Sequence, residues 1–149
     1  HGFRGFVGER NFLMETLDGE VLACADSSWA YIDVKTGHPV KASEEERAAY
    51  PVEEKLDMKS LGRRIRIPEE RQEMGGFTVR QHHVNNAQYI RLSQEYIPAD
   101  FQVQRLRAEY KRQAVLGDQI FPMVSKTEDS YVVALCNEEK EPYAVVEFS

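Results

Sequence analysis

Residues 83–90, His-Val-Asn-Asn-Ala-Gln-Tyr-Ile, combine a titratable imidazole with two carboxamides at the start of a predicted helix. Imidazole is largely neutral near pH 7, so His83 is a candidate general base. The first N–H groups of a helix lack partners and carry partial positive charge, which suits a polarised carbonyl. The pattern favours hydrolysis of an acyl ester, although a cap or surface residue is the plain alternative. Asn85 equally fits capping and catalysis.

The elements that position these residues follow from the hydrophobic pattern. The sequence predicts a helix over residues 84–96, ended by Pro98, with apolar side chains around most of its circumference. Such a helix should be largely enclosed. A short strand from Phe77 precedes it, and strands over 103–116, 119–126, 131–137 and 142–148 follow, the first of them with period-two alternation. One enclosed helix followed by four antiparallel strands predicts an α+β fold in which the sheet wraps around the helix.

The first part of the chain has a different pattern. Residues 12–16, 21–26 and 29–34 predict a β-meander, with a hairpin turn at 17–20 and Trp29 in its core. Ser43, followed by Glu46, begins a predicted short helix that Pro51 ends. The polar, proline-bounded residues after it are typical of a connector. We therefore predict three segments: strands over 1–40, a helix and linker over 41–76, and a second domain over 77–149.

Composition limits the function classes. The 149 residues are 42% hydrophobic and 30% charged, as in ordinary globular proteins. The formal net charge of −6 argues against nucleic-acid binding, and no apolar run is long enough to span a bilayer. Cys24 and Cys136 match no metal-ligand spacing and are predicted to be buried free thiols in a reducing, cytoplasmic compartment. The chain starts at His1, within strand-like sequence, which is compatible with a longer natural chain. No metal or cofactor is expected.

With these residues in order, the chain resembles the acyl-acyl carrier protein thioesterases of bacteria and plant plastids. The likeness extends over essentially the whole sequence. The matching pieces are Arg10-Asn-Phe12 with Gly19, Ser28-Trp29, Ile32-Asp33, Thr36-Gly37, Phe77-Thr-Val-Arg80, His83-Val-Asn-Asn86, Tyr89-Ile90, Glu109-Tyr110, Gly117-Asp118 and Val132-Val-Ala-Leu-Cys136.

The resemblance implies two tandem hotdog folds, each a long helix wrapped by an antiparallel sheet. Residues 1–40 would be the last strands of an incomplete first hotdog, and 77–149 the second. The implied activity is hydrolysis of the thioester of fatty acyl-acyl carrier protein in fatty acid biosynthesis, a part of lipid metabolism. Unpaired sheet edges would remain, which leaves pairing of two copies open.

Two departures concern the chemistry. The family carries an Asp-x-Asn-x-His pattern before the helix, whereas only Gln81 and His82 separate Arg80 from His83. The Asp and Asn positions are therefore either lost or missing from this sequence. Plant members also carry a Glu-Cys pair on the next strand, where this chain has Gln113-Ala114. A nucleophilic cysteine at that position is thereby excluded.

The predicted mechanism is general-base hydrolysis without a covalent intermediate. His83 is the base or orients it, the first helical N–H groups hold the oxyanion, and Gln113 positions a water without taking its proton. The full set of predicted site residues is His83, Asn85 and Gln113 for catalysis and Asn86, Tyr89 and Tyr110 for substrate binding.

Docking of an acidic acyl carrier protein would require local basic patches despite the negative net charge. Two clusters qualify, and a solvated charged surface is the plain alternative for each. The predicted docking residues are Arg63, Arg64, Arg66, Arg105, Arg107 and Lys111.

Two other functions stay open. A hotdog hydrolase of coenzyme A thioesters would need no basic patch. A catalytically inactive acyl-binding or assembly module is favoured by the absent Asp-x-Asn pattern and by Gln113.

Overall fold

A computed structural model describes residues 1–59, 61–62 and 64–149. The chain forms two compact units, His1–Leu61 and Gly62–Ser149. Both contain antiparallel sheets, and the second also contains the longer helix, so the predicted α+β class is confirmed. The boundary between the units lies inside the predicted linker, residues 41–76. The three-segment division itself stays a prediction.

The first unit holds a three-stranded antiparallel sheet of β1 (Gly2–Arg4), β2 (Val7–Glu15) and β3 (Val21–Ala30). Gly19, with φ of 84°, closes the predicted hairpin turn between β2 and β3. The predicted strand over 29–34 is wrong as a separate element, since β3 runs on to Ala30. Trp29 is 52% exposed and Cys24 is exposed, so their predicted burial is wrong for this chain. Each sits on a sheet with little apolar cover.

Helix α1 (Glu44–Ala48) follows in the first unit. Ser43 Oγ accepts the Glu46 N–H at 3.1 Å, and the Glu46 carboxylate accepts the Ser43 N–H at 2.7 Å. This reciprocal capping box satisfies two orphan donors of the helix start. The predicted helix start at Ser43 is confirmed.

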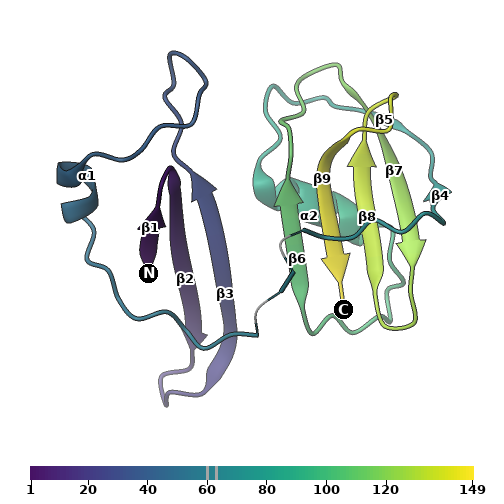
Figure 1. Cartoon of the computed structure of the whole chain (residues 1–149). Coiled ribbons are helices and arrows are strands. Elements are labelled where there is room, and N and C mark those ends of the chain that lie inside the picture. The colour runs from purple at the N-terminus through teal and green to yellow at the C-terminus, as the bar shows by residue number, and fades with distance from the viewer. Residues whose placement is uncertain (60, 63) are drawn as a thin grey trace. The chain divides into compact units, whose positions relative to one another are not determined.

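The second unit is a six-stranded sheet in the order β4, β7, β8, β9, β6, with β5 also paired to β7 (Figure 1). The bounds are β4 Gln72–Glu73, β5 Phe77–Thr78, β6 Leu106–Tyr110, β7 Gln119–Lys126, β8 Tyr131–Cys136 and β9 Pro142–Phe148. The predicted strands near 119–126, 131–137 and 142–148 are confirmed. Strand β4 was not predicted, because its two residues are polar and carry no periodic signal.

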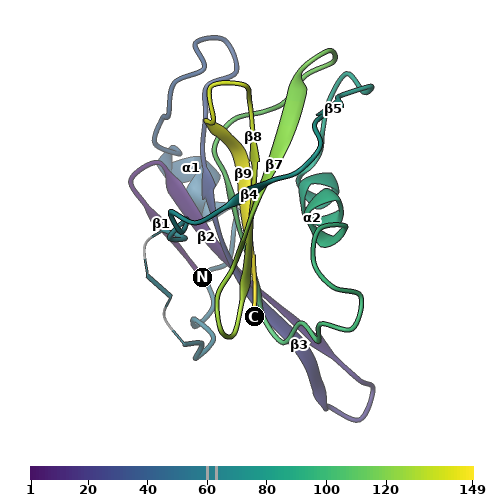
Figure 2. The same ribbon diagram turned by 90° about the vertical axis from the view of Figure 1, so that its right-hand side faces the viewer.

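Both faces of the central strands are covered. Val133 and Leu135 of β8 join a core beneath helix α2 (Asn86–Gln94), whereas Val132, Ala134 and Cys136 join a second core on the opposite face. Alternate residues of a strand point to opposite faces, so the continuous apolar run of β8 fills both cores. Figure 2 shows α2 against one face of this sheet. The segment that carries Ile65 and Ile67 crosses the other face (Figure 1).

Helix α2 is shorter and more open than the sequence predicts. It extends from Asn86 to Gln94 rather than over 84–96, and only Tyr89 and Ser93 are fully buried along it. Arg91, Gln94 and Glu95 are exposed. The prediction of an enclosed helix is therefore wrong: the sheet covers one side of α2 and does not surround it.

Strand β6 ends at Tyr110, although the alternation in the sequence continues to Ala114. The N–H groups of Lys111 and Arg112 both donate to the Tyr143 carbonyl, at 2.8 and 3.1 Å. Two residues therefore oppose one on β9, which is a β-bulge. A bulge adds a residue without changing side-chain types, so the alternation in the sequence could not reveal it.

Ser93 provides a test of the core beneath α2. Its hydroxyl is fully buried and finds no hydrogen-bond partner among the described residues. Because an unpaired buried hydroxyl is costly and alanine favours helix, Ser93→Ala should raise the free energy of unfolding by about 1 kcal/mol. Chemical denaturation measures this. The matched control is Ala144→Ser, which adds a hydroxyl to the same core and should cost about 1–3 kcal/mol. A clear loss of stability in Ser93→Ala would contradict the structure.

Candidate active site

The start of α2 is fixed by a capping box. Asn85 Oδ1 accepts the Gln88 N–H at 3.0 Å, and Gln88 Oε1 accepts the Asn85 N–H at 3.1 Å. The Gln88 amide nitrogen also donates to Gln81 Oε1 at 2.7 Å, which ties the preceding loop to the helix. Val84 and Tyr89 occupy the positions of a hydrophobic staple, and both are buried in the same core. Asn85 thus caps α2, as one of its two predicted roles requires. Its catalytic role stays a prediction.

Two helix donors remain free beside this cap. In the part of the chain that the structure describes, the N–H groups of Asn86 and Ala87 meet no acceptor. They point from the positive end of the helix dipole. An oxygen with developing negative charge would find two donors here.

His83 lies two residues before the cap and contacts Gln113. The amide nitrogen of Gln113 and His83 Nδ1 share a hydrogen bond across 30 residues of sequence. Both side chains are exposed. With Nδ1 as the acceptor, the neutral ring carries its proton on Nε2. A half-turn of the amide presents Oε1 instead, which accepts from Nδ1–H and leaves the Nε2 lone pair free. The second arrangement suits a general base.

The bulge at Lys111 and Arg112 brings Gln113 to this position. The next residue, Ala114, is 0% exposed and donates its N–H to Tyr89 Oη at 2.7 Å. Val115 N–H is held by Asp118 Oδ2 at 3.0 Å. Bulges are common beside active sites because they redirect side chains. This bulge places the Gln113 amide against the loop that precedes α2.

The predicted substrate residues lie around the same helix start. Tyr110 Oη donates to the Asn86 carbonyl at 3.2 Å, and Tyr110 is 41% exposed. Tyr89 is only 2% exposed, so its ring faces the core. Burial raises the pKa of the Tyr89 hydroxyl, the hydrogen bond from Ala114 opposes that rise, and the Asp118 carboxylate adds to it. The phenol is therefore neutral near pH 7. Tyr110 and Asn86 are exposed and accessible to a substrate, whereas Tyr89 is buried. The substrate-binding roles of Tyr89, Tyr110 and Asn86 stay predictions.

The chain passes directly from Arg80 through Gln81 and His82 to His83. A groove of about 350 Å³ opens beside this loop, between β5 and α2. Phe77, Val79, Val84 and Leu92 supply its apolar lining. His83 itself does not line the groove, although its neighbour Val84 does.

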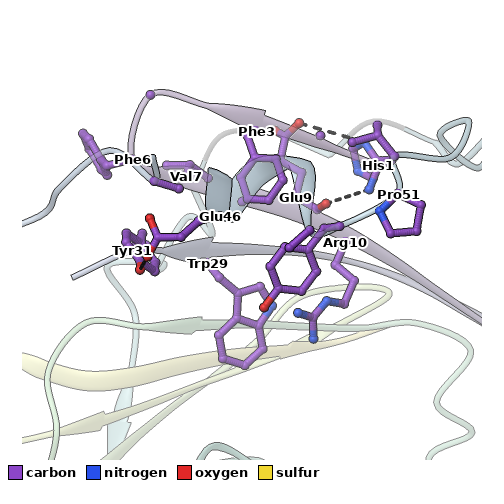
Figure 3. Close-up of a pocket in the computed structure, with 18 residues that line it drawn as sticks. His1, Phe3, Phe6, Val7, Glu9, Arg10, Trp29, Tyr31, Glu46 and Pro51 are labelled. Atoms are coloured by element: carbon purple, nitrogen blue, oxygen red, sulfur yellow. Dashed lines mark hydrogen bonds and ion pairs between the residues drawn. The ribbon is translucent and has the colours of Figure 1, made fainter. Parts of the chain in front are cut away.

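A larger cavity of about 460 Å³ lies in the first unit (Figure 3). Its lining includes the rings of Phe3, Trp29, Tyr31 and Tyr50. Tyr31 hydrogen-bonds to Glu46 in this lining, and that bond together with burial raises the pKa of the Tyr31 hydroxyl. None of the predicted catalytic residues is in this cavity.

The predicted docking residues differ in exposure and in ion pairing. Arg107 is paired with Glu109 at 3.1 Å, its side chain is 18% exposed, and Lys111 bonds the same carboxylate. Burial alone would raise the pKa of Glu109, but the bonds from Lys111 and the Ile65 N–H and the charge of Arg107 outweigh it and lower that pKa. Glu109 therefore stays ionised and neutralises part of the cluster.

The remaining docking candidates are more accessible. Arg64, Arg66 and Arg105 are exposed and form no ion pair within the described ranges. Arg63 lies outside the residues that the structure describes. The docking roles stay predictions.

No group of three or more His, Cys, Asp or Glu side chains in the described chain is arranged to hold a metal ion. Among the same residues, no helix has the length and apolar character needed to cross a membrane.

Comparison with solved structures identifies the fold. An acyl-ACP thioesterase from Bacteroides thetaiotaomicron superposes with a TM-score of 0.85 at 20% identity. A putative oleoyl thioesterase from Lactobacillus plantarum gives 0.76 at 20% identity, and the 12:0-ACP thioesterase from Umbellularia californica gives 0.80 at 17%. This chain has the fold of these thioesterases. The resemblance drawn from the sequence is confirmed at that level.

The likeness covers 99%, 98% and 99% of this chain but only 64%, 63% and 64% of the three solved chains, in the same order. The chain thus spans less than two thirds of their length. No protein-family model matches the sequence, and no curated protein matches it.

Sequence reasoning did not single out Gln88, Ala114 or Glu109, and it assigned Tyr89 to substrate binding rather than to the bond with Ala114. The Asn-x-x-Gln spacing of Asn85 and Gln88 is a capping signature that was available in the sequence. The Tyr89 hydroxyl and the Ala114 N–H had no such signal, since a tyrosine with helical spacing indicates core and a backbone N–H leaves no pattern. Glu109 lies between the predicted docking residues Arg107 and Lys111, and this spacing was a signal in the sequence that both are paired.

Substitution of Asn85 separates its two roles. Asn85→Ala removes the cap and should lower the free energy of unfolding by about 1 kcal/mol. Asn85→Asp keeps the acceptor and places negative charge at the positive helix end, so stability should be retained. Denaturant unfolding measures both. Equal stability of Asn85→Ala and the wild type would contradict the cap, whereas an activity loss in both variants would add a catalytic role.

Proposed function

We propose that this chain hydrolyses the thioester of fatty acyl-acyl carrier protein, releasing a free fatty acid and the carrier protein. The observation that carries the proposal is the contact between His83 and Gln113 at the open start of α2. The fold shared with solved thioesterases supports it. On this proposal the second unit is a hotdog domain, residues 1–40 are the last strands of another, and the protein acts in the cytoplasm.

The proposed reaction needs a base, a water and oxyanion donors. Gln113 Oε1 accepts Nδ1–H of His83, and His83 Nε2 takes a proton from water as the water attacks the thioester carbonyl carbon. The resulting tetrahedral oxyanion is held by the N–H groups of Asn86 and Ala87. When the intermediate collapses, the C–S bond breaks and the imidazolium proton passes to the departing thiolate. The acyl group forms no covalent bond to a protein side chain at any step.

The groove between β5 and α2 is the space available for the acyl chain in the second unit. Burial of each methylene contributes about 0.8 kcal/mol, which is roughly fourfold in affinity. Tyr110, exposed beside the Asn86 carbonyl, would contact the thioester end. Substrate preference would then follow the depth of the groove.

The decisive experiment is hydrolysis of acyl-acyl carrier protein by His83 and Gln113 variants. His83→Gln should lower kcat by about 10²–10⁴-fold, because the general base is lost. Gln113→Leu should lower kcat by a smaller factor, whereas Gln113→Glu keeps an acceptor for Nδ1–H and should retain activity. Undiminished hydrolysis by His83→Gln would refute the mechanism. A trapped acyl-enzyme would refute it equally.

A catalytically inactive acyl-binding module is the second candidate. It is favoured by one observation: Gln113, a neutral amide, is the group that meets His83, and no ion pair of His83 occurs in the described part of the chain. Binding of the thioester without turnover by the wild type would decide for it. Equal cleavage of acyl-coenzyme A and carrier-linked substrate would instead indicate a coenzyme A thioesterase.

Carrier-protein docking gives a separate prediction. The double variant Arg64→Glu/Arg66→Glu reverses two exposed charges and should raise KM for acyl-acyl carrier protein about fivefold or more at low salt. KM for an acyl-coenzyme A substrate should not change. Lys126→Glu, a single charge reversal on an exposed residue of β7, serves as the control. An unchanged KM in the double variant would exclude docking at this patch.

A further inference from the structure

The contact between Gln113 and His83 joins two exposed side chains, and water competes for both partners of such a pair. Each side chain also loses rotamer freedom when it is held in one place. Neither residue can fix the other. The geometry must come from the two backbone segments that carry them.

Those segments are joined by one hydrogen bond that water does not reach. Ala114 follows Gln113, is fully buried, and donates its N–H to Tyr89 Oη at 2.7 Å. Tyr89 belongs to α2, whose cap at Asn85 lies two residues after His83. One end of this hydrogen bond is thus one residue from Gln113, and the other end is six residues from His83.

In the described chain, the other backbone hydrogen bonds of residues 111–118 do not reach α2. Arg112 N–H binds the Tyr143 carbonyl, Val115 N–H binds Asp118, and Gly117 N–H binds the Val79 carbonyl. They tie the loop to β9, to itself and to the segment after β5. Within the described chain, Ala114 supplies the only backbone N–H of this loop that reaches a side chain of α2.

A second tie between the helix and this region exists at the surface. Tyr110 Oη donates to the Asn86 carbonyl at 3.2 Å from a partly exposed ring. Water can replace this bond at little cost. The Tyr89 bond has no such substitute, because an unpaired N–H at Ala114 would be buried.

We propose that Tyr89 is a positioning residue: its hydroxyl, through the Ala114 N–H, holds Gln113 in register with His83. The consequence for hydrolysis depends on the proposed function, whereas the structural effect on His83 does not. Loss of the hydroxyl leaves the Ala114 N–H without an acceptor, so the loop moves to hydrate it. A hydrogen bond requires heavy atoms about 2.6–3.2 Å apart, so even a small movement separates Gln113 from the ring.

The test uses the full chain labelled with ¹⁵N-histidine, in wild type, Tyr89→Phe and Gln113→Ala. The chain has four histidines, and His83→Gln assigns the His83 ring signals among them. Ring ¹⁵N shifts report which nitrogen carries the proton and which is hydrogen-bonded. Tyr89→Phe keeps the buried ring, so its His83 shifts should move most of the way to those of Gln113→Ala.

Tyr96→Phe is the matched control, because Tyr96 follows the same helix and packs against the same core, and in the described chain its hydroxyl makes no hydrogen bond to this loop. Its His83 shifts should equal those of the wild type. Amide exchange gives a second readout: Ala114 should exchange about tenfold faster or more in Tyr89→Phe, with β8 and β9 unchanged. In hydrolysis, kcat should fall about tenfold, or about 1.4 kcal/mol, with KM unchanged.

Each result decides the proposal. Unchanged His83 shifts in Tyr89→Phe would overturn it. Loss of protection throughout β8 and β9 would also overturn it, since the hydroxyl would then support the whole fold. If the shifts move as expected while the wild type cleaves no thioester, the positioning role stands and the proposed function fails.

Discussion

The packing of α2 against β8 and β9 is the constraint on which the site depends. Val84 and Tyr89 enter the core beneath the helix together with Val133 and Leu135. Burying side chains of this kind contributes about 1.5–3 kcal/mol each, which is more than the roughly 1 kcal/mol expected of the cap at the exposed helix start. These buried side chains fix the orientation of the helix about its axis, and Asn85 caps the helix in that orientation. Because the N–H groups of a helix point along its axis toward the N-terminal end, the packing that fixes the axis of α2 also fixes the direction of the free N–H groups of Asn86 and Ala87.

Much of the second unit could be predicted from the sequence, and the reason is physical. The apolar runs of β7, β8 and β9 are bounded by polar turns, and a strand buried on both faces leaves a continuous run that fixes its bounds. The helix start was also readable, since carboxamides before an apolar stripe are typical of a cap. The bulge at Lys111 and Arg112 was not readable, because it inserts a residue without altering the alternation. The openness of α2 was missed because Tyr89, Leu92 and Tyr96 suggested apolar cover on every side.

The candidate site divides in the same way. His83 was visible as a residue type at a helix start, and Gln113 only through the family resemblance, yet they lie in contact across the fold. Their chemical roles remain proposals. The parts that hold them together were invisible: a backbone N–H at Ala114 and a hydroxyl on a residue that resembles any other core tyrosine. The sequence suggested more free positive charge on this strand than the structure has, since Glu109 lies between Arg107 and Lys111 and binds both. Residues two apart in a strand share a face, so a basic side chain there has to be considered together with an acidic one two positions away.

An amide at residue 113 has a physical consequence that a carboxylate would not have. A carboxylate can only accept, so it would fix the proton of a neutral imidazole on Nδ1 and add a charge to the site. Glutamine presents a donor and an acceptor on one group, so either ring tautomer finds a partner after a half-turn of the amide. Chemical competence then rests on orientation rather than on charge, and orientation is what the backbone must supply. A neutral partner therefore makes the site more dependent on the buried hydrogen bond at Tyr89 than a charged partner would.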